Sequence, residues 1–147
     1  MSARLRILVA DDLGSDGLEI LKTAGEVTVR TGMDEGQLRD ALKGHHALVV
    51  RSATKVTAGA LEGADQLAVG GRAGSGIDNI DVAAATAKGI AVMNTPEASA
   101  VTTAEHALAL PVSLARKIPA ADASIRAGKW DKKAFTGVEL QDKVLCV

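Results

Sequence analysis

The sequence is poor in aromatic residues, which are Trp130 and Phe135 alone. With so few rings it offers no platform on which nucleic-acid bases could stack, and its core must consist of Ala, Val, Leu and Ile. Basic residues are not in excess, because 17 Lys and Arg stand against 18 Asp and Glu. This balance gives no electrostatic reason to expect a nucleic acid or an acidic membrane surface as a partner.

Cysteine is equally scarce, since Cys146 is the only one. A single cysteine excludes an internal disulfide and favours a reducing compartment. The apolar run near the N-terminus is too short for a signal peptide, and no run approaches the roughly 20 residues that cross a membrane. We therefore expect a cytoplasmic protein without a membrane segment.

Metal ligands are also lacking. The sequence has His45, His46 and His106, of which the first two are adjacent and point apart, and no second cysteine accompanies them. Because structural and catalytic metals need several spaced ligands, we predict no metal site. His106 is expected to pack within a helix rather than to act in catalysis.

Short apolar segments recur at intervals of roughly twenty residues, with helical patterns between them. Three of these helical patterns end at glycines suited to helix termination, Gly25, Gly44 and Gly89. The alternation predicts a doubly wound, flavodoxin-like α/β domain with a parallel five-stranded sheet over residues 1–98. The expected strands are Leu5–Ala10, Val27–Val29, Ala47–Val50, Leu67–Val69 and Ile90–Met93.

Residues 99–147 do not continue this repeat. They predict a C-terminal helical arm, with a first long helix beginning near Thr102, which has capping-box spacing to Glu105. A second helix follows Pro119, and Lys143–Val147 is expected to begin the first strand of a missing Rossmann domain. The 99–147 part is thus predicted to hold linking or dimerisation helices and the start of a truncated nucleotide-binding domain.

A glycine-rich turn follows the fourth predicted strand. Gly74 and Gly76 flank Ser75, so backbone amides can approach an anion there, and Arg72 adds a positive charge. Asn79 stands where the dinucleotide fingerprint needs its third glycine, and Ile77 where a P-loop needs lysine. The alternatives left are an anion-binding turn and a tight turn that only lets the chain cross the sheet edge.

A second polar segment follows the third predicted strand. Arg51 can bind phosphate or carboxylate as a fork, Ser52 adds a hydroxyl or amide, and Lys55 adds a point charge. An ordinary solvated loop is the alternative. Because neighbouring parallel strands end at one edge of the sheet, we expect Arg51 and the glycine turn to face one crevice.

Asp11 and Asp12 follow the first strand, where receiver domains hold a metal ion. Such a domain needs a carboxylate after the third strand, and Arg51 stands there, where its charge would repel a metal. We therefore interpret Asp11 and Asp12 as turn and capping residues.

Five segments of the sequence form a distinctive set: 50–57 (VRSATKVT), 71–81 (GRAGSGIDNID), 94–96 (NTP), 104–106 (AEH) and 128–130 (GKW). Together they resemble the D-3-phosphoglycerate dehydrogenases of the D-2-hydroxyacid dehydrogenase family. The resemblance implies oxidation of 3-phosphoglycerate to 3-phosphohydroxypyruvate with NAD as cofactor, the entry step of serine biosynthesis. It covers nearly the whole chain.

Residue roles follow from the resemblance. Substrate binding is implied for Arg51, Ser52, Arg72, Gly74 and Gly76, and for Ser99, which replaces the family's usual substrate-contacting asparagine; Ser75 matches a position that touches the cofactor. Lys132 and Lys133 are implied to reach a partner subunit's site, in a homodimer formed through residues 99–135.

The same resemblance places the dinucleotide fingerprint and the catalytic Arg, Glu and His beyond the residue that matches Val147. We therefore expect this chain to hold no catalytic residue, to bind a small phosphorylated hydroxy acid and to be inactive alone, as a fragment or truncated product. The alternative is a non-catalytic module that binds small anions or dimerises.

Overall fold

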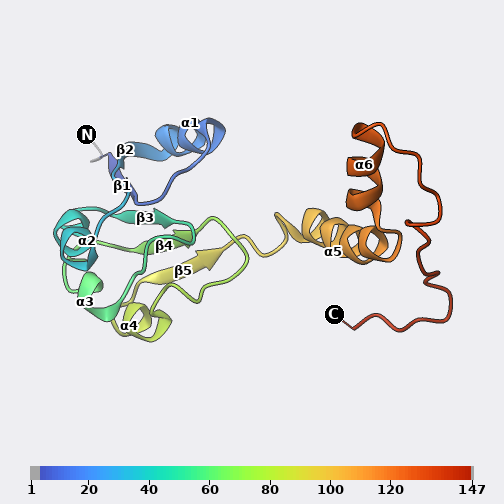
Figure 1. The fold of residues 1–147 in the computed structure, drawn as a ribbon. Helices are drawn as coiled ribbons and strands as arrows, with labels where there is room; N and C mark the ends of the chain where they lie inside the picture. Colours follow the sequence, from blue (N-terminus) through green and yellow to red (C-terminus); the bar gives the residue numbers. More distant parts are fainter. Residues whose placement is uncertain (1–3, 147) are drawn as a thin grey trace. The chain divides into compact units, whose positions relative to one another are not determined.

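The computed structural model describes residues 4–146, which fold as two compact units, one ending at Ser99 and one beginning at Ala100 (Figure 1). In the first unit strands and helices alternate along the chain, and the second is helical and then irregular. The elements of the first are β1 Leu5–Val9, α1 Ser15–Ala24, β2 Gly25–Val29, α2 Glu35–Leu42, β3 Ala47–Val50, α3 Ala58–Leu61, β4 Val69–Arg72, α4 Val82–Ala87 and β5 Ala91–Asn94; those of the second are α5 Ala100–Ala115 and α6 Ile118–Arg126.

The five strands form one parallel sheet in the order β2-β1-β3-β4-β5, which confirms the flavodoxin-like prediction. Leu48 of β3 lies between Leu8 of β1 and Gly70 of β4. The chain leaves β1 first towards β2 and later returns on its other side to form β3. The strand order therefore reverses between β1 and β3, and in open α/β sheets ligands bind at the carboxyl ends of the strands beside such a reversal.

The core lies between the sheet and helices α2, α3 and α4. Leu8 and Leu48 from the strands pack in one buried cluster with Leu38, Leu42 and Leu61 from the helices. Within the strands, Leu8 and Leu48 alternate with neighbours that point to the opposite face of the sheet, as strand geometry requires. Helix α1 packs on β2 without a fully buried side chain, so most of the core lies on the α2–α4 side.

One glycine interpretation was wrong, and another was right only in part. Strand β4 was expected to end at Val69, but it runs from there through Gly70 and Gly71 to Arg72, because pairing with β3 and β5 on both sides outweighs the poor strand propensity of glycine. Helix α1 does end at Gly25, whose amide donates to the Leu21 carbonyl oxygen, but Gly25 has φ of -171°, which is extended backbone and not the left-handed conformation, and it also begins β2.

The helix caps were partly predicted. Gly44 and Gly89 have φ of 72° and 73°, as glycines that end helices in the left-handed conformation do. Asp81 accepts a hydrogen bond from the Ala84 amide at 2.9 Å and caps α4. Asp78 and Asn79 do not act as caps, since Asp81 already holds the cap position and leaves them inside the loop.

In the second unit, α5 begins at Ala100 and not near Thr102, because the turn before it continues directly into the helix and needs no cap at Thr102. Residues 143–146 form no strand, and Val147 lies outside the described residues. A parallel strand needs a neighbour to receive its hydrogen bonds, and none is supplied within residues 4–146. Over the same described range, no helix is long and apolar enough to cross a membrane.

Candidate functional site

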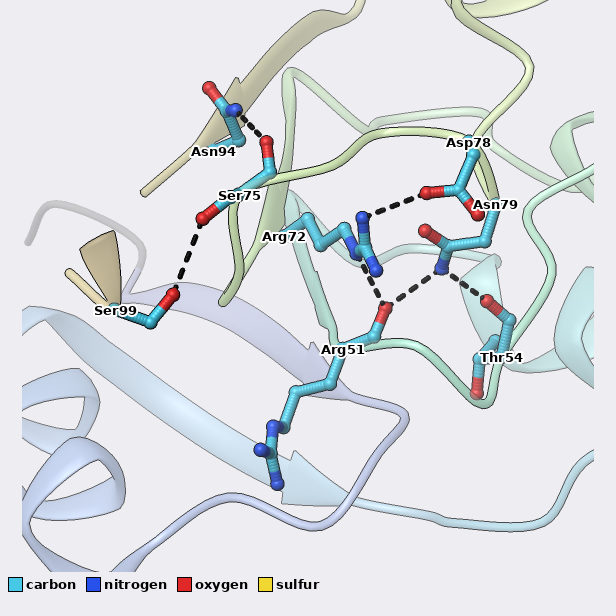
Figure 2. Close-up of polar contacts among 8 residues, drawn as sticks. All are labelled: Arg51, Thr54, Arg72, Ser75, Asp78, Asn79, Asn94 and Ser99. Atoms are coloured by element: carbon cyan, nitrogen blue, oxygen red, sulfur yellow. Dashed lines mark hydrogen bonds and ion pairs between the residues drawn. The ribbon is translucent and has the colours of Figure 1, made fainter. Parts of the chain in front are cut away.

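The candidate site is formed by three loops at the carboxyl edge of the sheet. Residues 51–57 follow β3, residues 73–81 follow β4 and residues 95–99 follow β5. Polar contacts join each loop to the next, and Figure 2 shows the side chains that make them. The loop after β3 starts beside the reversal of strand order, where the sheet topology favours a ligand.

A buried carboxylate, that of Asp11, accepts hydrogen bonds from the turn after β3 and holds it in place. Asp11 is 5% exposed and accepts hydrogen bonds from the Arg51 amide at 2.6 Å, from the Thr54 hydroxyl at 2.6 Å and from the Thr54 amide at 3.1 Å. Asp11 is therefore a structural anchor, and its interpretation as a turn and capping residue was wrong. Asp12, next to it, is exposed.

These bonds control the charge of Asp11. Burial by itself raises the pKa of the carboxyl group, but the hydrogen bonds from Thr54 and from the Arg51 amide together outweigh it and hold the pKa below 3.8. The group is ionised at neutral pH, and the ionised form accepts the bonds from the turn. A charged anchor therefore fixes the backbone that carries Arg51 and Ser52.

Arg51 presents its backbone and its side chain in different directions. Its carbonyl oxygen faces the loop after β4, whereas its guanidinium points away from Arg72 and Asn79 (Figure 2). The side chain is exposed, and its contact is a long bond of 3.3 Å from Nη1 to the Asp12 carbonyl oxygen. The predicted crevice between the Arg51 guanidinium and Gly74–Gly76 is therefore not formed by this side-chain conformation.

Arg72 is committed to contacts within the protein. Its side chain is 12% exposed, Nη1 donates to Asp78 Oδ1 at 3.0 Å, and Nε donates to the Arg51 carbonyl oxygen at 3.2 Å. Gly76 leaves room for this pair, because a Cβ there would lie 2.5 Å from Arg72 Nη1 and 2.8 Å from Asp78 Oδ1. The geometry gives Arg72 and Gly76 a role in loop structure, in addition to the ligand contacts that the resemblance implies.

The glycine turn nevertheless exposes backbone donors. The Gly74 amide is used in a bond to the Arg72 carbonyl oxygen, but between residues 4 and 146 the amides of Ser75 and Gly76 donate to no other group. The Ser52 amide of the neighbouring loop is likewise unused within those residues. Free amides grouped on adjacent loops can bind an anion, which agrees with the sequence interpretation.

The loop after β5 is tied to the same turn. Asn94 Nδ2 donates to the Ser75 carbonyl oxygen at 2.7 Å, the Ser75 hydroxyl donates to the Pro96 carbonyl oxygen at 3.1 Å, and Ser75 Oγ lies 3.4 Å from Ser99 Oγ. Ser75 and Ser99 are thus brought together and are both exposed. Their hydroxyls are near enough to act on one ligand.

An apolar hollow of about 250 Å³ lies beside these loops. It is lined by strand residues and by the first loop residues after two of the strands: Val49, Gly71, Arg72, Met93 and Asn94, with Ala73 and Thr95. Arg51, Ser52 and Gly74 do not line it, so the predicted anion ligands and the hollow are neighbouring features. The exposed loop atoms that could bind an anion therefore lie beside this hollow and do not line it.

Lys132 and Lys133 belong to the second unit and are exposed. Lys132 Nζ lies 5.5 Å from the centre of the Trp130 ring, a cation–π distance that orients its ammonium group. Within residues 4–146, no three His, Cys, Asp or Glu side chains lie close enough together to hold a metal ion.

Sequence reasoning missed three residues that organise the site: Asp11, Thr54 and Asn79. Asn79 Nδ2 donates to the carbonyl oxygens of Arg51 at 2.8 Å and of Thr54 at 2.7 Å. The available signal was that Asp11 and Asn79 both follow strands beside the predicted crevice, where short polar side chains can bond loop backbone.

Comparison with known proteins shows the family to which the chain is similar. The family described as D-isomer specific 2-hydroxyacid dehydrogenase, catalytic domain, matches residues 7–144. The chain is 50% identical over 143 residues to the D-3-phosphoglycerate dehydrogenase of Methanocaldococcus jannaschii, covering 97% of this chain and 27% of that protein. It is 45% identical over 142 residues to the enzyme of the same name from Synechocystis, covering 97% and 26%. The chain thus spans about a quarter of the length of these relatives.

Solved structures share the fold. The TT0316 protein of Thermus thermophilus has a TM-score of 0.81 at 29% identity, with 93% of this chain and 46% of that one covered. An acyclic imino acid reductase, solved in complex with NADPH and D-Arg, also has a TM-score of 0.81, at 26% identity, with 95% and 47% covered. Residues of this chain therefore match slightly less than half of each structure.

Proposed function

The chain belongs to the family of D-isomer specific 2-hydroxyacid dehydrogenases, and from this premise we propose that it is the substrate-binding portion of an NAD-dependent D-3-phosphoglycerate dehydrogenase. The whole enzyme would oxidise 3-phosphoglycerate to 3-phosphohydroxypyruvate for serine biosynthesis. The observation that carries this proposal is the 50% identity to a D-3-phosphoglycerate dehydrogenase over 97% of the chain. Because the match covers 97% of the chain, it extends over the loops as well as the core.

The geometry supports a substrate with two anionic groups. Arg51 has an exposed guanidinium with one long bond, so it can turn towards a phosphate or carboxylate and bind it as a fork. The free amides of Ser52, Ser75 and Gly76 offer further donors on the adjacent loops. A phosphorylated hydroxy acid carries a phosphate and a carboxylate that these donors can share.

The described residues of this chain, 4–146, do not themselves form a cradle for a dinucleotide. The turn after β4 has Asn79 where a third glycine is needed, and the side-chain amide of Asn79 is occupied by contacts to the loop after β3. Ser75, the residue implied to touch NAD, already donates its hydroxyl to the Pro96 carbonyl oxygen. When bound in the whole enzyme, NAD would accept the hydride, and this chain would bind and orient the substrate.

Titration calorimetry of the 147-residue chain with 3-phosphoglycerate tests the proposal, and Gly74→Ala is the informative variant. A Cβ at Gly74 would make only ordinary contacts, 3.7 Å from Arg72 Nε, so the fold is kept while the methyl group obstructs the anion. We expect wild type to bind and Gly74→Ala to bind about tenfold more weakly, the loss of roughly one charge-assisted bond. Neither protein is expected to reduce NAD.

Gly36→Ala serves as the matched control, since a Cβ there would also have an open surrounding, with Asp34 Oδ1 at 3.5 Å. It lies in α2 and should bind like wild type. Wild type that gives no heat with 3-phosphoglycerate, or equal affinity in the wild type and Gly74→Ala, would contradict the proposed site.

We further propose that residues 99–135 form a homodimer interface, through which Lys132 and Lys133 reach the partner's site. Helices α5 and α6 contain no fully buried residue, and the exposed apolar side chains of α5 include Val101 at 71% and Leu114 at 81% exposure. Apolar surface at about 25 cal/mol per Å² favours association where folding does not bury it. In a two-fold interface, the helix of each copy covers the apolar surface of the same helix in the other copy.

Light scattering after gel filtration at micromolar concentration measures the oligomeric state. Wild type is expected at twice 15.0 kDa, and Leu114→Lys at 15.0 kDa, because the lysine would place a charge in the apolar interface. Ile20→Lys, at a 69% exposed site in α1, should remain dimeric. A wild-type monomer, or dimers in all three proteins, would refute an interface through α5.

A second candidate is a non-catalytic module that binds small anions or dimerises, favoured by the free amides and by the missing dinucleotide motif. It differs in selectivity. Such a module would bind inorganic phosphate as tightly as 3-phosphoglycerate, whereas a substrate domain gains affinity from the carboxylate.

A further inference from the structure

Two side chains bind the backbone of the turn after β3, one to its N–H groups and the other to its C=O groups. On the amide side, Asp11 accepts from the Arg51 and Thr54 N–H groups. On the carbonyl side, the single Asn79 Nδ2 donates to the oxygens of the same two residues, at 2.8 Å and 2.7 Å (Figure 2). One amide group thus spans the turn and connects it to the loop after β4.

Asn79 is itself firmly placed. The backbone carbonyl oxygen of Asn79 accepts a hydrogen bond from the Val56 amide at 2.8 Å, and the Asp81 amide donates to the Val56 carbonyl oxygen at 2.8 Å. These two bonds form a parallel bridge between Val56 and Ile80, the residue that follows Asn79. The Asn79 Oδ1 is buried and has no hydrogen-bond partner within residues 4–146. Rotating the side-chain amide would therefore lose two good bonds and set Oδ1 against two carbonyl oxygens.

The Arg51 carbonyl oxygen accepts a second bond, from Arg72 Nε at 3.2 Å. This oxygen belongs to the peptide group whose nitrogen is that of Ser52. The peptide groups of residues 4–146 include no cis bond, and in a trans peptide the N–H points opposite to the C=O. Fixing the oxygen towards Asn79 therefore aims the Ser52 N–H away from Asn79, and no group within the described residues accepts from it.

We propose that Asn79 is a positioning residue of the anion site, acting through the Arg51 carbonyl to hold the peptide plane that presents the Ser52 amide. Asn79 does not touch the ligand. It sets the direction of a donor that does, and it keeps the Arg51 backbone in place while the side chain turns. The identity of the ligand in this proposal rests on the proposed function; the orientation of the peptide does not.

The first measurement needs no ligand. In ¹H–¹⁵N spectra of the 147-residue chain, Asn79→Ala should move the Ser52 amide resonance and speed the hydrogen exchange of the Arg51 and Thr54 amides. Asn94→Ala is the matched control, because Asn94 makes the equivalent side-chain bond to the Ser75 carbonyl oxygen at 2.7 Å and does not touch the turn. It should leave the Ser52 resonance in place. An unmoved Ser52 resonance in folded Asn79→Ala overturns the proposal.

Calorimetry with 3-phosphoglycerate and with inorganic phosphate then measures the consequence. Asn79→Ala should weaken binding about tenfold. It should weaken binding by a similar factor in an Arg51→Ala background, because that variant keeps the backbone carbonyl and the Ser52 amide through which Asn79 acts. A loss that disappears in the Arg51→Ala background would overturn the positioning role, because Asn79 would then act through the guanidinium. If Asn79→Ala does not fold, Asn79→Ser is measured the same way. Its single, shorter hydroxyl cannot donate to both carbonyl oxygens, so wild-type-like binding and spectra would count against the proposal.

The two proposals fail differently. If wild type binds neither ligand, the proposed function fails, and the Ser52 resonance still decides whether Asn79 orients the turn. If wild type binds and Asn79→Ala binds equally well, the positioning proposal fails and the proposed function stands.

Discussion

Replacing Asp11 with alanine should lower the free energy of unfolding by about 3 kcal/mol, since each buried donor left without a partner costs roughly 1 to 3 kcal/mol. The carboxylate accepts from the Arg51 amide, the Thr54 amide and the Thr54 hydroxyl, and Thr54 is 5% exposed. Urea unfolding followed by circular dichroism measures the change. Asp12→Ala removes an exposed neighbouring carboxylate and should stay within about 0.5 kcal/mol of wild type.

The same residue predicts a pH dependence with a definite sign. The pKa of Asp11 is lowered in the folded protein, because its hydrogen bonds outweigh burial, so the unfolded chain binds its proton more readily. Its contribution to stability is therefore present above pH 3.8 and is lost as the pH falls through the lower folded-state pKa. Asp11→Asn, which cannot titrate, should lose less stability than wild type below pH 3.8. Parallel stability curves for the two proteins would show that Asp11 is not the anchor.

Arg51→Ala is expected to weaken 3-phosphoglycerate binding by about tenfold to a hundredfold, since a charge-assisted bond to an anion contributes roughly 1.5 to 3 kcal/mol. Stability should hardly change, because the guanidinium makes one long bond and the anchoring contacts of Arg51 all come from its backbone. Calorimetry measures the affinity, and urea unfolding checks the fold.

Two further variants make this result specific. Arg30→Ala removes the same charge from the end of β2 and should bind nearly as well as wild type, which separates a direct contact from a change in net charge. Arg51→Lys keeps the charge and loses the fork, so its affinity should fall between those of wild type and Arg51→Ala. Equal affinity in Arg51→Ala and wild type would remove Arg51 from the site.

Local patterns in the sequence determined the fold class. Ala47–Val50 was predicted as a strand with the bounds that it has, because a short apolar run between polar residues is suited to burial on both faces of a parallel sheet. Thr57 and Asp81 are of residue types that favour the first position of a helix, and both accept a bond from an amide three residues later. These features depend on neighbours within one turn of chain, so the sequence alone is enough to locate them.

The sequence also placed the candidate site at the carboxyl edge of the sheet, since strand order and strand direction fix where the loops after β3 and β4 emerge. It did not locate the end of β4 correctly, because pairing of Gly70 and Gly71 with both neighbours is a property of the sheet. Glycine propensity describes an isolated segment, and two ladders of hydrogen bonds outweigh it.

Only the tertiary structure decided what the polar residues of the site do. Asp11 became a buried anchor through bonds to residues about 40 positions away, and Asn79 joined two loops 28 positions apart. The sequence predicted Arg72 as a ligand contact, as it did Arg51, but the Arg72 side chain donates hydrogen bonds to Asp78 and to the Arg51 backbone. A short polar side chain can bond whichever backbone group the fold brings within hydrogen-bonding distance, and that distance is set by how the strands pair rather than by the residues beside it.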